Sequence, residues 1–207
     1  MTAAADRAPA AIDWATLMNR SPAYIDVTRL AACFDGRIGV RLCERLRGAI
    51  RLQGRLSAMI SEFYALAPPV GPDAVSPADR KVAMLPSASV SNIICRAGAV
   101  YWANAIANAV RAEEVRWLRE RLGETTHIFA LENRALSGPP EKLDMADGAE
   151  TRIVEDGVRC LAAWCQLQPV AIGGRVRLKS PASLALDGIV QSPFNIIGPA
   201  IIRCAAA

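Results

Sequence analysis

The sequence has few of the side chains on which catalytic and metal sites depend. Aromatic residues make up 5% of its 207 residues, and His127 is the only histidine. One histidine cannot build a metal site with others of its kind, and a catalytic base would need a nucleophile and an orienting group beside it. We therefore interpret His127 as structural, and we predict no catalytic residue, no metal and no cofactor.

Cysteines are present but are not arranged in pairs. None of the six belongs to a C-x-x-C motif, and most lie in apolar segments that have a helical pattern. Cys160 and Cys165 are five apart, which places them on different faces of a helix and argues against a shared metal. This usage is typical of buried thiols in a reducing compartment and not of a disulfide framework.

Long apolar runs and nucleotide-binding motifs are also missing. No run reaches the roughly 18 apolar residues of a membrane span, and the opening MTAAADRAPAA has no apolar core like that of a signal peptide. The glycines in AIGGRVRLK, residues 171–179, fit neither a phosphate loop nor a dinucleotide-binding motif. They are typical of a helix end followed by basic residues. We expect a cytoplasmic protein.

The residues that are abundant favour helix. Apolar residues make up 52% of the chain, which is enough for a core, and Ala, Leu and Arg lose little on entering a helix. No alternating strand pattern persists. We predict an all-α fold, an irregular bundle of long and short helices with proline-rich loops and little or no strand. We expect residues 1–11 to be a flexible terminus, 12–181 a single helical domain, and 182–207 an apolar tail whose structure the sequence leaves open.

The apolar spacing predicts three long helices, over residues 38–66, 90–111 and 150–166, and a shorter one that begins at Pro169. In the first, Gly48 and Gly54 allow a kink. Its apolar residues are expected to share one inward face. They are Leu42, Leu46, Ala49, Ile50, Leu56, Ile60 and Phe63. Residues 67–86 contain several prolines and are expected to form a loop.

Arginines concentrate at residues 37–55, where Glu44 is the only acidic residue. They form two sets with i, i+4 spacing, Arg37, Arg41, Arg45 and Arg47, Arg51, Arg55. A solvated helix face would explain them, with the arginine stems covering apolar surface. The functional alternative is a cationic surface for an acidic protein or for phosphates. Because few aromatic residues accompany them to stack on bases, an acidic protein is favoured over nucleic acid. The candidate partner-binding arginines are Arg41, Arg45, Arg47, Arg51 and Arg55.

Two aromatic residues lie in irregular chain near the start. Trp14 precedes the proline-broken segment MNRSPAYIDVTRL, residues 18–30, and Tyr24 lies within it. Core packing is the default for such rings, but aromatic residues in irregular chain are also candidates for interface anchors. We therefore add Trp14 and Tyr24 to the candidate partner-binding residues.

Three segments carry a resemblance to a known family, in the same order along the chain. In MNRSPAYIDVTRL the matching residues are Met18, Asn19, Pro22, Tyr24, Ile25, Arg29 and Leu30. In ICRAGAVYWANAIANAVRAEEVRWLRERLGE they are Ala97, Gly98, Ala99, Arg111, Glu114, Val115, Leu118, Arg119, Leu122, Gly123 and Glu124. In DGVRCLAAWCQLQPVAIGGRVRLKSP they are Cys160, Leu161, Pro169, Arg177, Leu178, Lys179 and Pro181. Together these segments resemble the SctK/YscK family, accessory proteins of the sorting platform of bacterial type III secretion systems.

The resemblance implies a helical, non-enzymatic cytoplasmic adaptor. Such a protein links the cytoplasmic domain of the inner-membrane ring protein to the pod protein of the sorting platform, and meets the membrane only through its partners. Nucleic acid is not an expected partner. Two other hypotheses remain open: a nucleic-acid-binding helical regulator that uses the arginines of residues 37–55, and a small helical enzyme that uses His127 or a cysteine.

Overall fold

The computed structural model describes residues 12–144 and 148–207, and this part of the chain is all-α, as predicted. It contains twelve α-helices, four short 3-10 helices and no strand. The α-helices are α1 (Trp14–Asn19), α2 (Val27–Ala32), α3 (Val40–Gly48), α4 (Gln53–Phe63), α5 (Pro77–Ala83), α6 (Ser87–Tyr101), α7 (Ala103–Ala107), α8 (Ala112–Leu122), α9 (Glu124–Glu132), α10 (Ala149–Leu167), α11 (Val170–Arg177) and α12 (Phe194–Ala205). The terminus predicted to be flexible, residues 1–11, lies outside the described residues.

The centre of the molecule is the packing of α6 against α10, where two glycines bring the backbones together. A Cβ atom added to Gly98 would lie 1.9 Å from the carbonyl oxygen of Ile153. One added to Gly157 would lie 2.0 Å from the carbonyl oxygen of Ile94. No side chain fits at either position, so both glycines are required by the close approach. The two helices form the axis on which the other helices pack.

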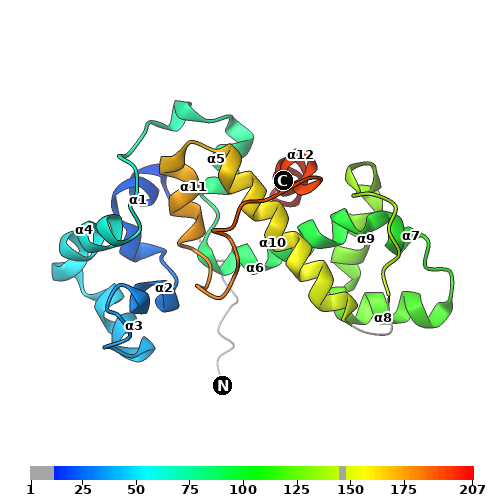
Figure 1. Cartoon of the computed structure of the whole chain (residues 1–207), viewed down its shortest axis with the longest axis horizontal. Helices are drawn as coiled ribbons and strands as arrows, with labels where there is room; N and C mark the ends of the chain where they lie inside the picture. The colour runs from blue at the N-terminus through cyan, green and yellow to red at the C-terminus, as the bar shows by residue number, and fades with distance from the viewer. Residues whose placement is uncertain (1–11, 145–147) are drawn as a thin grey trace, which may run out of the picture.

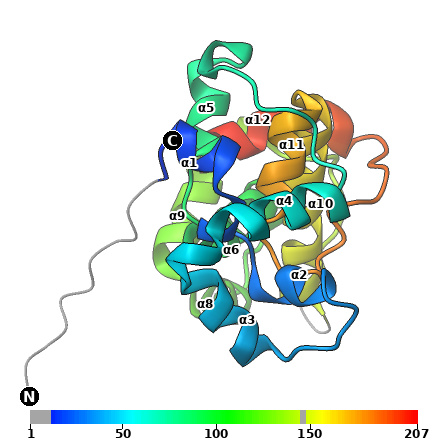
Figure 2. The ribbon, with the colours of Figure 1, turned by 90° about the vertical axis from the view of Figure 1, so that its left-hand side faces the viewer.

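The helices are arranged along one long direction. Helices α1 to α4 lie at one end and α7 to α9 at the other, and α6 and α10 run between them (Figure 1). Figure 2, turned by 90°, shows α1 to α4 in front of the central helices. The molecule therefore has two well-separated ends built from different parts of the sequence.

The prediction of one helix over residues 38–66 is wrong in one respect, because the structure has two helices there, α3 and α4. Ala49 takes an extended conformation, with φ −79° and ψ 102°, and a 3-10 turn, Ile50–Leu52, follows it. The break changes the helical phase, so the predicted inward face does not hold throughout. Leu56 and Ile60 are buried, as expected, but Ile50 is 86% exposed and Leu42 is 41% exposed.

The stretch 67–86, predicted to be a loop, contains helix α5. Ser76 is its N-cap, accepting a hydrogen bond from the Asp79 backbone N–H, and Pro77 occupies the first turn. Ser-Pro-x-Asp is a recognisable helix start, but the proline density of the segment hid it. The predicted helix 90–111 is also shorter than expected: α6 ends at Tyr101, and α7 covers only Ala103–Ala107.

Two other predicted helices are confirmed. The expected helix 150–166 corresponds to α10, and the helix expected after Pro169 corresponds to α11. The last residues, left open by the sequence, contain α12, which packs on α10, α6 and α5. Within α12, Ile201 and Ile202 are fully buried. The predicted end of the helical domain at residue 181 remains a prediction.

Candidate partner-binding surface

The arginines predicted to bind a partner are mostly exposed on α3, on α4 and on the turn between them. We use the term arginine surface for Arg41, Arg45, Arg51 and Arg55, all of which are exposed. Within the described residues, no carboxylate lies within the 4.0 Å of an ion pair from any of their guanidinium groups. These guanidinium groups therefore form no ion pair within the described residues, although the exposed Glu44 of α3 is close to Arg41 and Arg45 in sequence.

Aliphatic side chains are exposed in the same stretch of chain. Ile50, in the turn between α3 and α4, is 86% exposed. Val40 and Leu42, in the first turn of α3, are 42% and 41% exposed. The region therefore combines unpaired positive charge with uncovered apolar surface, a combination typical of a protein interface.

At the opposite end of the molecule, several arginines lie at ion-pair distance from carboxylates. Arg111, just before α8, lies 3.9 Å from Glu114, and Arg119 of α8 lies 3.4 Å from Glu124 at the start of α9. Arg121 lies 3.6 Å from Glu150 on α10. Such surface pairs contribute little to stability, but they neutralise charge locally. Arg116 of α8 is exposed and has no carboxylate at this distance among the described residues, so unpaired arginines occur at both ends and are more numerous at the α3–α4 end.

Arg47 was predicted with the exposed arginines but has a structural contact. Its side chain is half-buried, and its Nη1 donates a hydrogen bond of 3.0 Å to the carbonyl oxygen of Ile25. It thereby ties α3 to the irregular segment ahead of α2. A helix pattern could not have separated Arg47 from Arg51, because the distinction depends on a carbonyl twenty-two residues earlier in the chain.

The structure places Tyr24 in the core, the default expected for such rings. Its ring is only 3% exposed, and its hydroxyl donates a 2.7 Å hydrogen bond to the carbonyl oxygen of Leu17. A ring enclosed in this way packs the core, and a role of Tyr24 in partner binding remains a prediction. Trp14 is half-buried, and its Nε1 donates to the carbonyl oxygen of Val70 at 2.9 Å. It holds the proline-rich stretch, and its place in an interface remains a prediction.

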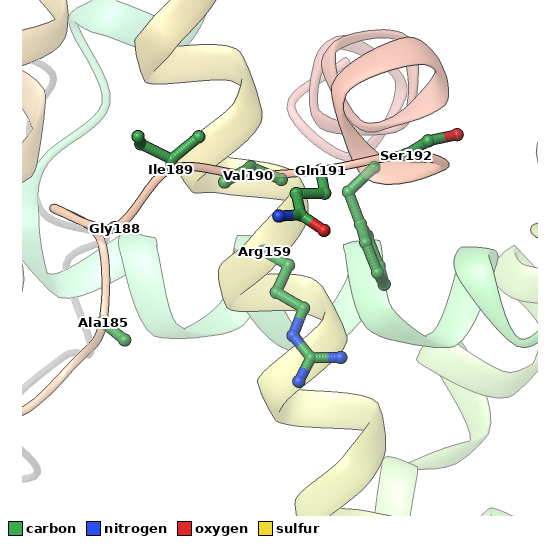
Figure 3. Close-up of a pocket in the computed structure, with 8 residues that line it drawn as sticks. Arg159, Ala185, Gly188, Ile189, Val190, Gln191 and Ser192 are labelled. Atoms are coloured by element: carbon green, nitrogen blue, oxygen red, sulfur yellow. The ribbon is translucent and has the colours of Figure 1, made fainter.

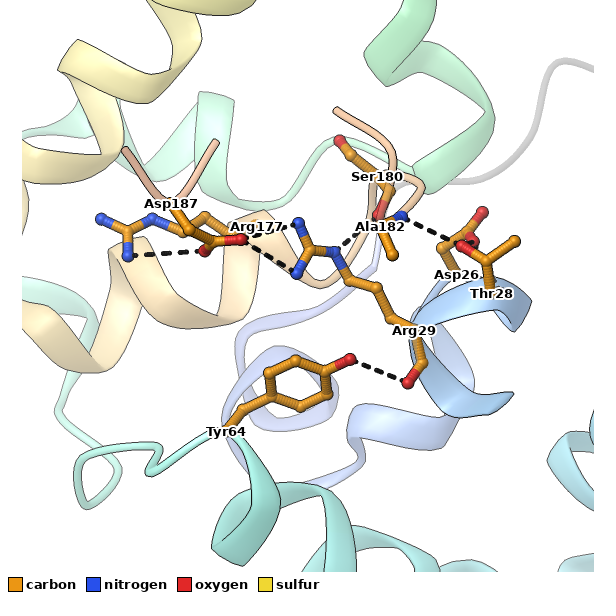
Figure 4. Close-up of polar contacts among 8 residues, drawn as sticks. All are labelled: Asp26, Thr28, Arg29, Tyr64, Arg177, Ser180, Ala182 and Asp187. Carbon is orange, nitrogen blue, oxygen red and sulfur yellow. Dashed lines mark hydrogen bonds and ion pairs between the residues drawn. The ribbon is translucent and has the colours of Figure 1, made fainter. Parts of the chain in front are cut away.

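A buried polar cluster fastens the helices that carry the arginine surface to the rest of the molecule. We call residues 178–193 the strap. Arg29 of α2, only 3% exposed, donates from Nε to the carbonyl oxygen of Ser180 at 2.8 Å and lies 3.4 Å from Asp187, both in the strap (Figure 4). Tyr64 donates to the carbonyl oxygen of Arg29 at 2.8 Å, which adds the end of α4.

Two further buried cations are satisfied by carbonyl groups. Arg175 of α11 donates to the carbonyl oxygens of Met18, Ala67 and Ala171 at 2.8–3.1 Å. Lys179 of the strap donates from Nζ to the carbonyl oxygens of Ala83 and Leu85 at 2.5 and 2.6 Å. These bonds join α11 and the strap to α1, to the proline-rich stretch and to the end of α5. Sequence reasoning missed both residues, because long-range carbonyl acceptors leave no local signal.

Two buried carboxylates receive tryptophan N–H groups. Asp79 of α5 accepts from Trp164 Nε1 at 2.8 Å and from Arg203 Nε at 2.7 Å. Burial alone would raise the pKa of Asp79, but its hydrogen bonds from Arg203, Ser76 and Trp164 outweigh burial and lower it. Asp156 of α10 accepts from Trp102 Nε1 at 2.8 Å, and burial raises its pKa. Both carboxylates are engaged in packing contacts between helices.

The groups that an enzyme hypothesis would use are buried or half-buried. His127 is 5% exposed, and burial, followed by the nearby Arg119, lowers its pKa. Burial raises the pKa of every thiol, and that of Cys165 reaches about 12. Protonated thiols are poor nucleophiles. Across residues 12–144 and 148–207, no three His, Cys, Asp or Glu side chains are grouped so as to hold a metal ion, and no helix has the length and apolarity to cross a membrane.

A groove of about 420 Å³ lies where the strap passes α10. Arg159 extends from α10 beneath the strap, and Ile189 to Ser192 form the opposite wall (Figure 3). The Arg159 guanidinium is 2.7 Å from Asp156, so its charge is already paired. The other lining residues are Ala185, Gly188 and Phe194. The lining residues include the hydroxyl group of Ser192 but no histidine, cysteine or carboxylate.

The described residues thus define an all-helical protein whose most distinctive surface is cationic and partly apolar. Comparison with known families agrees with this class. The family model described as YOP proteins translocation protein K (YscK) matches residues 14–196. The chain belongs to this family, and it is a type III secretion protein. No curated protein and no solved structure matches it.

Proposed function

We propose that the protein is a non-enzymatic cytoplasmic adaptor of a type III secretion apparatus. It links the cytoplasmic domain of the inner-membrane ring protein to the pod protein of the sorting platform, and so supports the secretion of effector proteins. The observation that carries the proposal is the unpaired arginine surface on a chain of the YscK family. The protein reaches the inner membrane only through these protein partners.

The shape of the molecule supports a bridging role. An adaptor needs two separate surfaces, and the α1–α4 and α7–α9 ends are held apart by α6 and α10 (Figure 1). The two ends also differ electrostatically, since Arg111, Arg119 and Arg121 lie at ion-pair distance from carboxylates and, among the described residues, the four members of the arginine surface do not. Ends of different chemistry suit two different partners.

The arginine surface also favours a second candidate, a helical regulator that binds nucleic acid. Guanidinium groups bind phosphates well, and this hypothesis predicts affinity that falls steeply and linearly with the logarithm of salt concentration. The exposed apolar residues nearest these arginines in sequence, Val40, Leu42 and Ile50, are aliphatic, however, and aliphatic side chains do not stack on the bases of a single strand. We therefore place the adaptor first.

A three-component binding experiment tests the adaptor. The ring protein's cytoplasmic domain is immobilised, and the pod protein is passed over it with and without the full chain. We expect the pod protein to be retained only when the chain is present. Direct retention of the pod protein at the same level without the chain, or failure of the wild-type chain to bind either partner, would refute the bridging role. A labelled DNA duplex assayed at several salt concentrations tests the second candidate.

A further inference from the structure

We propose that the α3–α4 end docks an acidic protein surface in which carboxylates surround an apolar contact for Ile50. The proposal rests on the adaptor function and specifies the chemistry of one of its two partners. Its anchor residue, Ile50, was expected from sequence to point inward. The structure instead places Ile50 at the break between α3 and α4, with 86% of its surface exposed.

The positive charge of this surface indicates that the partner surface is negatively charged. Arg41 and Arg45 lie on α3, and Arg51 and Arg55 follow in the next turn and in α4. None of these four has a carboxylate at ion-pair distance within the described residues, although Arg111, Arg119 and Arg121 at the other end do. Unpaired guanidinium groups are the preferred partners of carboxylates, which they bind with two parallel hydrogen bonds. The complementary surface is therefore acidic.

The apolar side chains supply a centre for the interface. Interfaces gain most of their affinity from a few residues that become fully covered, with charged residues at the rim. Ile50 fits the central position, since it is nearly fully exposed in the free protein and adjoins Arg51 in sequence. Leu42 and Val40 add partly exposed apolar area on α3.

The same features distinguish a protein from a membrane or a nucleic acid. A helix that lies in a lipid surface turns its apolar face to the lipid, but Cys43 of α3 is fully buried and Leu46 is half-buried against the core. The inward apolar face of α3 is thus already occupied by the protein. Single-stranded nucleic acid is held by stacking on aromatic rings. The exposed apolar residues nearest the arginines in sequence, Val40, Leu42 and Ile50, are aliphatic, and the exposed aromatic ring of Phe63 lies at the far end of α4.

The test uses the full chain and two probes, the purified ring cytoplasmic domain and the purified pod protein, each titrated by calorimetry. The variants are Ile50→Ala and the double reversal Arg45→Glu with Arg51→Glu. The chain offers matched controls at its other end. Val110 is 87% exposed, so Val110→Ala controls for the loss of an exposed aliphatic side chain. Arg111→Glu with Arg116→Glu makes the same change in net charge on and beside α8.

We expect one probe to bind Ile50→Ala at least about tenfold more weakly, and the double reversal more weakly still. Both controls should bind that same probe as the wild type does. All the altered side chains are exposed, so circular dichroism and thermal melting should match the wild type. Wild-type affinity of Ile50→Ala and of the double reversal for both probes would overturn the docking surface and leave the adaptor function intact. Failure of the wild-type chain to bind either probe would overturn both.

Three further outcomes would show another occupant and overturn the proposal. The first is flotation of the wild-type chain, but not of the double reversal, with vesicles of phosphatidylglycerol and phosphatidylcholine. The second is binding of the wild-type chain, but not of the double reversal, to a DNA duplex. The third is self-association in sedimentation that Ile50→Ala abolishes. An acidic protein partner predicts none of these and predicts instead that raising the salt concentration weakens the wild-type complex.

Discussion

At the scale of single residues, the N-terminal helices are held by buried cations that bond to carbonyl groups. Lys179 shows this most clearly, because it is 3% exposed and its ammonium donates to the carbonyl oxygens of Ala83 and Leu85. The ring of Tyr24 lies 5.7 Å from the same ammonium. Carbonyl oxygens satisfy the donors of a buried charge but do not neutralise it. The environment consequently favours the uncharged amine.

This arrangement predicts a pH-dependent stability. Burial lowers the pKa of Lys179 to about 7, against 10.5 for an exposed lysine. Above pH 7 the unfolded chain therefore holds a proton that the folded chain has released, and the free energy of unfolding rises with pH. Between pH 7 and about 8.5 we expect a rise of about 1–2 kcal/mol from this residue. At higher pH the buried thiols act in the opposite direction, because burial raises their pKa.

Urea unfolding of the wild type and of Lys179→Met across this pH range measures the effect. The free energy of unfolding of the wild type, relative to that of Lys179→Met, should rise by about 1–2 kcal/mol between pH 7 and about 8.5, because methionine cannot titrate. Lys142→Met, at an exposed lysine, should keep the pH dependence of the wild type. Parallel curves for the wild type and Lys179→Met would mean that Lys179 stays charged in its buried site.

At the scale of helices, the decisive contact is the glycine-mediated crossing of α6 and α10. The Gly157→Ala change would place a methyl group 2.0 Å from a backbone oxygen, which cannot move without shifting α6. We expect the free energy of unfolding to fall by at least about 2 kcal/mol, the order found for overpacked cores. Chemical denaturation monitored by circular dichroism measures this.

Gly54→Ala is the matched control within the same chain. Gly54 also lies in a helix, α4, but an added Cβ would have no atom within 4 Å. Alanine has the higher helix propensity, so this variant should be neutral or more stable by up to about 1 kcal/mol. Equal losses in the two variants would show that helix propensity or the unfolded state, and not the crossing of α6 and α10, determines the effect.

At the scale of the whole molecule, the last helix joins elements from the middle of the chain. Helix α12 packs on α10, α6 and α5, and its Arg203 bonds to Asp79 through Nε and Nη2. Asp79 in turn accepts from Trp164 in α10. Helix α12 therefore belongs to the same packed unit as the central helices, although it follows the residue at which the sequence predicted the domain to end.

A truncation tests this organisation. We expect a chain that ends at residue 193 to lose its cooperative melting transition and to bind a dye for exposed apolar surface. The truncation deletes α12, and with it the fully buried Ile201 and Ile202. It also leaves the Asp79 carboxylate without its partner Arg203. Arg203→Met, which keeps the helix, should lower the free energy of unfolding by about 1–3 kcal/mol. A truncated chain that melts within a few degrees of the wild type would instead support a domain complete at residue 181.

The sequence by itself determined the helical class, the approximate positions of α10 and α11, and the family to which the chain belongs. These follow from local information: apolar spacing, caps and the order of short motifs along one chain. The stretch of arginines at residues 37–55 was equally visible, because charge is a property of the residue and not of its surroundings.

The tertiary structure alone decided which of these residues face outward. The break at Ala49 exposes Ile50 to solvent, the hydrogen bond to the Ile25 carbonyl leaves Arg47 half-buried, and the ring of Tyr24 is enclosed in the core. Each outcome depends on backbone geometry or on a contact with another segment, and neither is encoded in the local pattern. The physical reason is that burial results from packing between distant parts of the chain, whereas periodicity reports only on neighbours.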